Sequence, residues 1–281
     1  MPALCLILLS FFQVSGCGGA KEAAPVPDAV LQSVGFNRKA EDSFKKGDYE
    51  RALIYYQEAL RVNRSIENTD GIAVELINIS AVCRRLKDNE NALRSIDEIL
   101  NNPSLQFSDP HRANAAFIKA MIHMDGERPE DASSWADKAL SFCGASRCGL
   151  EGKIFNLKGR IALSSGDASS AITFAAKGLD LSKGNGHAEE AANSLRLLAG
   201  AKALSGQHGE AFRLYEDAFS LDKSLGLSRK IALDLMGAGR ALLKQGRPDD
   251  AAAYFRRALS VARASGDEHR VKDAEAALRG D

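Results

Sequence analysis

Small and apolar residues recur along this chain with a period close to 40 residues. Alanine marks the clearest position, at intervals of 40, 40, 39, 40 and 40 residues: Ala52, Ala92, Ala132, Ala171, Ala211 and Ala251. A regular period of this length indicates supersecondary units that stack on one another. The pattern therefore predicts an array in which each unit packs on its neighbours rather than around one central core.

Each unit is expected to contain two antiparallel helices. In the first unit, Phe36, Ala40 and Phe44 stand four residues apart, which places them on one helix face. Gly47-Asp48 then ends this helix, because glycine adopts the left-handed C-cap conformation at low cost. A second helix is expected over residues 49–63, with inward positions at Ala52, Tyr56, Ala59 and Leu60.

Two further positions, mostly occupied by small residues, accompany the recurrent alanine. Twelve residues before it stand Ala40, Ser80, Ala120, Gly159, Ala199 and Gly239, and seven after it stand Ala59, Ile99, Ala139, Gly178, Ala218 and Ala258. Small side chains let two helices approach to the short end of the usual axial distance, about 8–10 Å. The chain is therefore expected to be all-α and built from closely packed helix pairs.

The small residue of the first helix, Gly-Asp-Tyr at the turn and Ala-aromatic-Ala in the second helix resemble the tetratricopeptide repeat. The resemblance implies a right-handed α-solenoid of six units over residues 31–265, with the first helices lining a concave groove. Residues 266–281 are expected to form a capping helix with a polar outer face. The usual repeat has 34 residues, so either the helices here carry an extra turn or the loops between units are longer.

The N-terminus predicts a membrane anchor. Residues 4–14 form an apolar run that is too short to span a bilayer, which needs about 20 residues, but is typical of a signal-peptide core. Val14-Ser15-Gly16-Cys17 follows it and resembles the lipobox of bacterial lipoproteins. The resemblance implies that residues 1–16 are removed and that Cys17 receives diacylglycerol. The basic residues that usually precede such a core are missing, and the alternative is a buried N-terminal helix that ends in a cysteine.

The residues after Cys17 predict a location and a tether. Gly18, Gly19 and Ala20 include no aspartate, which by resemblance to enterobacterial sorting implies the outer membrane, facing the periplasm. Two or three acyl chains give stable anchoring, whereas one chain binds reversibly. Residues 17–30 are expected to form a tether, because Pro25 and Pro27 exclude a continuous helix there.

Charge and candidate chemistry exclude several classes of function. Acidic and basic residues balance at 37 each, so no overall field attracts nucleic acid. The five histidines are scattered without ligand spacing, and no catalytic constellation or phosphate-binding loop is present, so neither a metal nor a cofactor is expected. Cys143 and Cys148 lie close together in a loop, and outside the cytoplasm such a pair is expected to form a disulfide. Cys83 is expected to be a small buried residue.

The concave groove is the predicted binding site. Its lining is expected to include Asn78, Phe117, Met121, Asn156, Arg160, Asn193, Arg196 and Arg240. Asparagine amides bind a peptide backbone as donor and acceptor, and arginine binds carboxylates through its planar fork. These residues predict a groove for an extended or helical segment with acidic and apolar character. The alternative is that they are ordinary solvated faces of the repeats.

The sequence thus favours a membrane-anchored scaffold of the bacterial envelope that binds envelope proteins or peptides and is not an enzyme. A sensory module that takes a small peptide or glycan is the alternative, and an enzyme with an unrecognised site ranks third.

Overall fold

A computed structural model describes residues 27–144, 148–184 and 186–280 of the chain. These residues form thirteen α-helices and no strand, so the predicted all-α class is confirmed. The helices are α1 (Asp28–Lys45), α2 (Tyr49–Ser65), α3 (Thr69–Arg85), α4 (Asn89–Asn101), α5 (Asp109–Asp125), α6 (Pro129–Cys143), α7 (Glu151–Ser164), α8 (Ala168–Gly184), α9 (Ala188–Leu204), α10 (His208–Ser224), α11 (Ser228–Lys244), α12 (Pro248–Ala264) and α13 (Glu268–Arg279).

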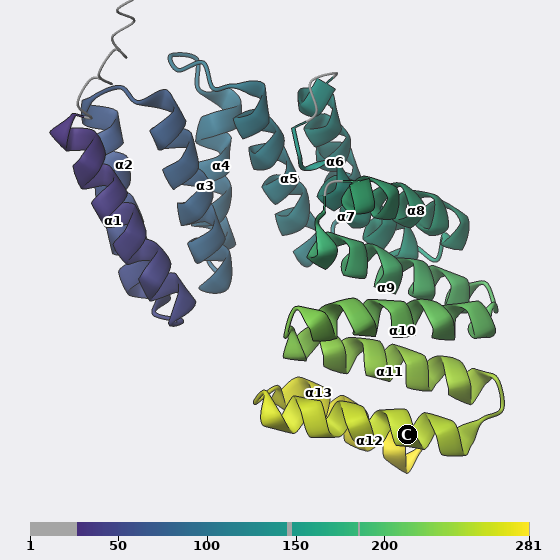
Figure 1. The fold of residues 1–281 in the computed structure, drawn as a ribbon. Coiled ribbons are helices and arrows are strands. Elements are labelled where there is room, and N and C mark those ends of the chain that lie inside the picture. The colour runs from purple at the N-terminus through teal and green to yellow at the C-terminus, as the bar shows by residue number, and fades with distance from the viewer. Residues whose placement is uncertain (1–26, 145–147, 185, 281) are drawn as a thin grey trace, which may run out of the picture.

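The helices stack as a solenoid whose direction changes along its length (Figure 1). Each odd-numbered helix from α1 to α11 packs antiparallel on the next helix, and α13 packs on α12. Odd-numbered helices also contact one another from α3 to α13, whereas successive even-numbered helices show no comparable contact in the described part of the chain. The odd-numbered helices, called first helices below, therefore form the inner surface, and the even-numbered second helices form the outer surface.

Long helices account for most of the 40-residue period. Eight of the helices, from α2 to α12, have 17 residues each. The turn inside each pair has only three residues, as at 46–48, 165–167 and 205–207. Of the two alternatives that the sequence leaves open, longer helices therefore explain the extra residues in most units. The linker between α4 and α5, residues 102–108, is longer than these turns, and the structure describes all of its residues.

The small residues of the repeat lie where helices meet. All six recurrent alanines are almost completely buried. A Cβ atom added to Gly159 on α7 would lie 2.4 Å from Leu197 Cδ2 on α9, and one added to Gly239 on α11 would lie 2.5 Å from Phe255 Cε1 on α12. Because nothing larger fits without displacing a neighbour, these contacts confirm the predicted close approach.

The ends of the chain differ slightly from expectation. The predicted signal peptide, Cys17 and most of the tether lie outside the described residues, and α1 already begins at Asp28, two residues before the expected end of the tether at 30. None of the described helices is long and apolar enough to cross a bilayer. At the other end, α13 is capped by Asp267, whose side chain accepts a hydrogen bond from the Arg270 backbone N–H at 3.2 Å.

In one turn, the residue with the left-handed backbone conformation is not the glycine but the residue after it. Between α5 and α6, Gly126 has a φ of −91°, whereas Glu127 has a φ of 55°. The backbone N–H of Arg128 donates to the His123 carbonyl at 2.9 Å, which fixes Glu127 at the centre of the turn. The corresponding residue in most other turns is glycine, for example Gly166 with a φ of 77°.

This strain gives a stability prediction. Because a left-handed conformation costs about 1–2 kcal/mol for a residue with a Cβ atom, Glu127→Gly is expected to raise the free energy of unfolding by about 1 kcal/mol. Urea denaturation measures the change. The matched control, Gly166→Ala, is expected to lower the free energy of unfolding. An unchanged or lower value for Glu127→Gly would show that the turn is not strained.

Candidate functional site

The residues predicted to line the groove all lie on first helices. The structure places Asn78 on α3, Phe117 and Met121 on α5, Asn156 and Arg160 on α7, Asn193 and Arg196 on α9, and Arg240 on α11. They therefore follow the inner surface along most of its length (Figure 1). Their individual surroundings divide them into residues that join repeats and residues that remain exposed.

Asn156 joins three helices instead of lining the groove. It is buried, its Nδ2 donates to the Glu190 carbonyl at 3.3 Å, and its Oδ1 accepts from the Ser194 hydroxyl at 2.8 Å. A Cβ atom added to Gly178 of α8 would lie 2.6 Å from the same Oδ1, so α8 also packs closely at this point. The amide that was expected to bind a partner backbone is therefore satisfied between α7 and α9.

Arg196 is the centre of a buried charge cluster. Its Nε donates to Asp234 Oδ1 at 2.6 Å, and its Nη2 forms an ion pair with Asp222. Both aspartates have no exposed side-chain surface. Asn193 belongs to the same network, because its Oδ1 accepts from Arg196 at 3.0 Å and from Lys230 at 2.9 Å. The guanidinium expected to recognise partner carboxylates is thus already neutralised by two carboxylates of the chain itself.

The cluster perturbs the titration of one of its members. Burial raises the pKa of the Asp234 carboxyl to about 7, although the Arg196 guanidinium opposes the shift and the Asp222 carboxylate adds to it. Two buried carboxylates share one guanidinium, so the cluster carries a net negative charge when both are ionised. A proton on Asp234 removes that excess charge at near-neutral pH.

Four of the predicted residues keep surface on the inner side. Arg160 and Arg240 are exposed and form no ion pair with any residue that the structure describes. Phe117 and Met121 are half-buried, and Met121 Sδ lies 3.9 Å from Arg84 Nη1. Arg240 also borders a hollow of about 240 Å³ beside Phe255 and α13. The exposed inner surface thus combines an apolar middle with separated positive charges.

Asn78 lies at the N-terminal end of this surface, next to a buried carboxylate. It contributes, with Asn37, to holding down the pKa of Glu75, but burial outweighs both amides and raises that pKa overall. Asn37 Nδ2 donates to Glu75 Oε1 at 2.7 Å. Asn78 therefore serves a contact within the chain and is only partly exposed.

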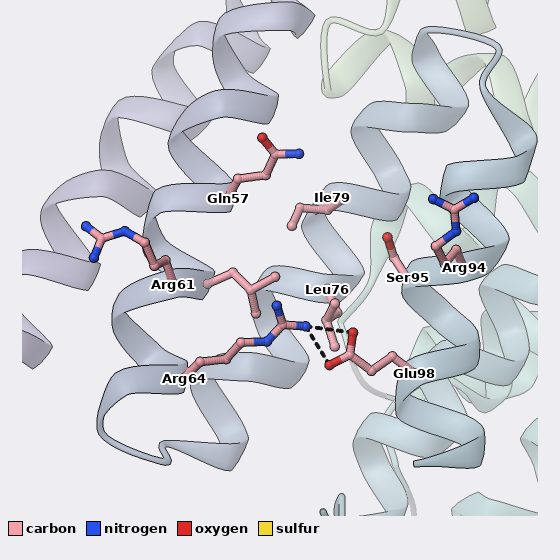
Figure 2. A pocket seen from close by; sticks show the side chains of 9 residues that line it. Gln57, Arg61, Arg64, Leu76, Ile79, Arg94, Ser95 and Glu98 are labelled. Atoms are coloured by element: carbon pink, nitrogen blue, oxygen red, sulfur yellow. Dashed lines mark hydrogen bonds and ion pairs between the residues drawn. The ribbon is translucent and has the colours of Figure 1, made fainter.

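A second hollow lies on the outer surface, where the sequence predicted no site. Figure 2 shows it between α2 and α4, with α3 as its floor. We call it the outer cleft; its volume is about 350 Å³, and its lining is Gln57, Leu60, Arg61, Arg64, Leu76, Ile79, Arg94, Ser95 and Glu98. The predicted groove residues all lie on first helices, whereas most residues that line the outer cleft lie on α2 and α4.

The cysteines lie at the link between α6 and α7. The structure joins Cys143 and Cys148 by a disulfide with an S–S distance of 1.98 Å, and the Cys148 backbone N–H donates to Glu151 Oε1 at 2.9 Å. Among the described residues, the side chains of Cys143, Cys148 and Glu151 form the only group of three or more histidine, cysteine, aspartate or glutamate residues whose ligand atoms lie close together. A disulfide leaves no thiolate for a metal. Cys83 is buried, as predicted, and burial raises the pKa of its thiol.

Comparison with known proteins supports the repeat assignment. Models of the tetratricopeptide repeat match residues 190–264 and 39–66. No curated protein sequence matches the chain significantly. These matches, together with the fold, support a scaffold of the kind that mediates protein–protein interaction, since stacked repeats present extended concave binding surfaces.

Solved structures share the architecture at low sequence identity. The apo form of RapI superimposes with a TM-score of 0.65 at 16% identity, covering 88% of this chain and 72% of RapI. A Rap protein complexed with Competence and Sporulation Factor gives 0.64 at 12% identity, with coverage of 89% and 70%. The type IV pilus biogenesis factor PilW gives 0.61 at 19% identity, with coverage of 81% and 92%. At these identities the likeness establishes the fold alone.

The charge cluster predicts a pH dependence of stability. The pKa of Asp234 lies above its ordinary value of 3.8 in the folded state, so the folded chain binds more protons than the unfolded chain between about pH 4 and pH 7. The free energy of unfolding is therefore expected to fall as pH rises through this window, by at most about 1.4 kcal/mol per pH unit from this group. Asp234→Asn removes the titrating carboxyl and is expected to weaken that fall, as measured by urea denaturation at several pH values.

The control is Asp180→Asn, which removes an exposed carboxylate from α8 and is expected to keep the wild-type dependence. Equal pH dependence in wild type and Asp234→Asn would contradict the assignment of the proton to this cluster.

Proposed function

We propose that this protein is a lipid-anchored scaffold of the bacterial cell envelope, whose inner surface binds a polypeptide segment of an envelope partner. The observation that carries the proposal is the exposed part of the inner surface, where Arg160 and Arg240 lack ion pairs within the described residues. The proposed activity is binding without catalysis.

The anchor rests on the N-terminal sequence. The short apolar run and Val14-Ser15-Gly16-Cys17 favour cleavage before Cys17 and acylation of its side chain and new N-terminus. Helix α1 begins at Asp28, eleven residues after Cys17. A chain of this length extends at most about 35–40 Å, so the solenoid would stay close to the membrane surface, which we propose is the periplasmic face of the outer membrane.

The inner surface selects the chemistry of the partner segment. Phe117 and Met121 offer half-buried apolar surface on α5, while Arg160 and Arg240 offer guanidinium groups on α7 and α11. Because neither arginine is paired with a carboxylate among the residues that the structure describes, each can form a charge-assisted hydrogen bond with an acidic residue of a partner. A segment that carries apolar residues followed by separated acidic residues fits this order.

The similar structures favour the same class of activity. One of them is a Rap protein in complex with Competence and Sporulation Factor, and another is the pilus biogenesis factor PilW. Both share with this chain the arrangement of helix pairs around an inner surface. They favour a polypeptide partner here, whether a free peptide or a segment of an envelope protein.

Charge reversal on the inner surface tests the proposal. In the native host, Arg160→Glu combined with Arg240→Glu is expected to reduce the amount of chemically crosslinked partner about tenfold or more, since losing two charge-assisted contacts costs more than 1.4 kcal/mol. The size of the crosslinked partner distinguishes a free peptide from an envelope protein.

A separate variant tests the anchor. Cys17→Ser alone is expected to release the protein from the membrane, as measured by membrane fractionation of the native host.

The matched control reverses two exposed arginines on outer helices, Arg213→Glu on α10 with Arg256→Glu on α12. This variant is expected to retain the partner. Equal capture by the inner and outer variants would overturn the inner-surface site, and continued membrane attachment of Cys17→Ser would overturn the anchor.

A further inference from the structure

One position of the second helices differs between units. Three residues after the recurrent alanine, five of the six units carry a large side chain, and the unit of α4 carries serine instead. The large residues are Tyr55, Trp135, Phe174, Leu214 and Tyr254, and the exception is Ser95.

The aromatic residues at this position lie against cations of the chain. The Trp135 ring has Lys119 Nζ at 4.2 Å and Lys138 Nζ at 4.1 Å from its centroid. The Phe174 ring has Lys158 Nζ at 4.9 Å. A cation near the face of an aromatic ring is attracted by the ring quadrupole. The repeat therefore favours an aromatic ring with neighbouring positive charge at this position.

In the last helix pair, α11 and α12, the side chain at this position is Tyr254, which contacts the preceding second helix. The Tyr254 ring packs edge-on against Phe212 of α10, with centroids 5.6 Å apart, and Arg257 lies 4.8 Å from its centroid. Burial and the neighbouring Glu216 carboxylate raise the pKa of the Tyr254 hydroxyl. Glu216 stands five residues after the recurrent alanine of α10, and Gln57 stands at the same position of α2. The side chain thus reaches across to the preceding second helix.

The outer cleft occupies the corresponding place in the unit that lacks the ring. Its lining includes both Ser95 and Gln57, the two positions that Tyr254 and Glu216 occupy in the last pair. Figure 2 shows Ser95 on one wall, Gln57 on the opposite wall and Ile79 between them. Leu60, Leu76 and Ile79 are buried and give the cleft an apolar floor. Its volume, about 350 Å³, lies within the range of ligand-binding pockets.

Arginines predominate among the charged residues at the rim of the cleft. Three arginines and one glutamate line it: Arg61, Arg64, Arg94 and Glu98. Arg64 pairs with Glu98 across the cleft at 2.7 Å, as the dashed lines of Figure 2 show. Among the described residues, Arg61 and Arg94 pair with acids of their own helices alone, and they keep 65% and 70% of their side-chain surface exposed. Such exposed pairs are weak, so both guanidinium groups can bind carboxylates of another molecule.

We propose that the outer cleft binds an aromatic side chain of a partner polypeptide, flanked by acidic residues. The ring would take the place that Tyr254 takes in the last pair, and the acidic residues would pair with Arg61 and Arg94. This site opens on the outer surface between α2 and α4, so it is separate from the inner-surface site and does not depend on it. An aromatic anchor in a desolvated pocket, surrounded by charge pairs, is a common form of binding hot spot.

Calorimetric titration with a synthetic peptide tests the proposal. The probe is the capped pentapeptide Asp-Glu-Trp-Glu-Asp, which is expected to bind the full chain saturably. Replacing its tryptophan by alanine, or its four acids by lysines, is expected to weaken binding about tenfold or more, because each change removes one of the two interactions.

Ser95→Tyr supplies the missing ring from the chain itself and is expected to abolish binding of the probe without lowering the melting temperature. The control, Ser220→Tyr, adds the same side chain at an exposed position of α10 and is expected to bind like wild type. Arg94→Glu is expected to weaken binding, whereas Arg213→Glu on α10 is not.

The proposal is overturned if the probe shows no saturable binding to wild type, or if it binds wild type and folded Ser95→Tyr equally. Analytical ultracentrifugation of the chain alone tests whether a second copy of the chain occupies the cleft. Self-association that disappears in Ser95→Tyr would assign the cleft to a second copy of this chain and would also contradict the proposal.

Discussion

Close contact between helices at small residues is the constraint on which the rest of this structure depends. Gly159 and Gly239 lie against side chains of neighbouring helices with no room for a Cβ atom, and the recurrent alanines are buried in every unit. Since each unit packs only on its neighbours, a regular contact repeated along the chain produces a regular stack. That stack sets the first helices on one side and the second helices on the other, and so creates two surfaces with different chemistry.

The fold could be predicted because this constraint is visible in the sequence. A small residue at a helix crossing recurs at a fixed interval, and the interval survives even where the turn chemistry changes. Details that depend on local geometry were harder to predict. The left-handed residue of one turn is Glu127 although Gly126 stands beside it, and the choice between longer helices and longer loops required the observed helix ends.

The inner surface shows why a candidate site is harder to predict than a fold. Arg160, Arg196 and Arg240 all lie on first helices, yet among the described residues Arg196 alone of the three pairs with aspartates, which lie 26 and 38 residues further along the chain. Whether a guanidinium is exposed or neutralised depends on such tertiary contacts, which no single repeat contains. At the outer cleft, the sequence points to the position but not to the site. Comparison of equivalent positions singles out Ser95, but only the structure shows that the missing side chain leaves a cleft with an arginine-rich rim.

The repeats themselves therefore explain architecture, and departures from the repeat carry the proposed binding functions. The most direct test of that account is site-specific photo-crosslinking in the native host, with a benzophenone amino acid placed at Met121 on the inner surface or at Asp217 on the outer side of α10. The account predicts a polypeptide adduct from Met121 and none from Asp217. An adduct from Asp217 alone, or from neither position, would contradict it.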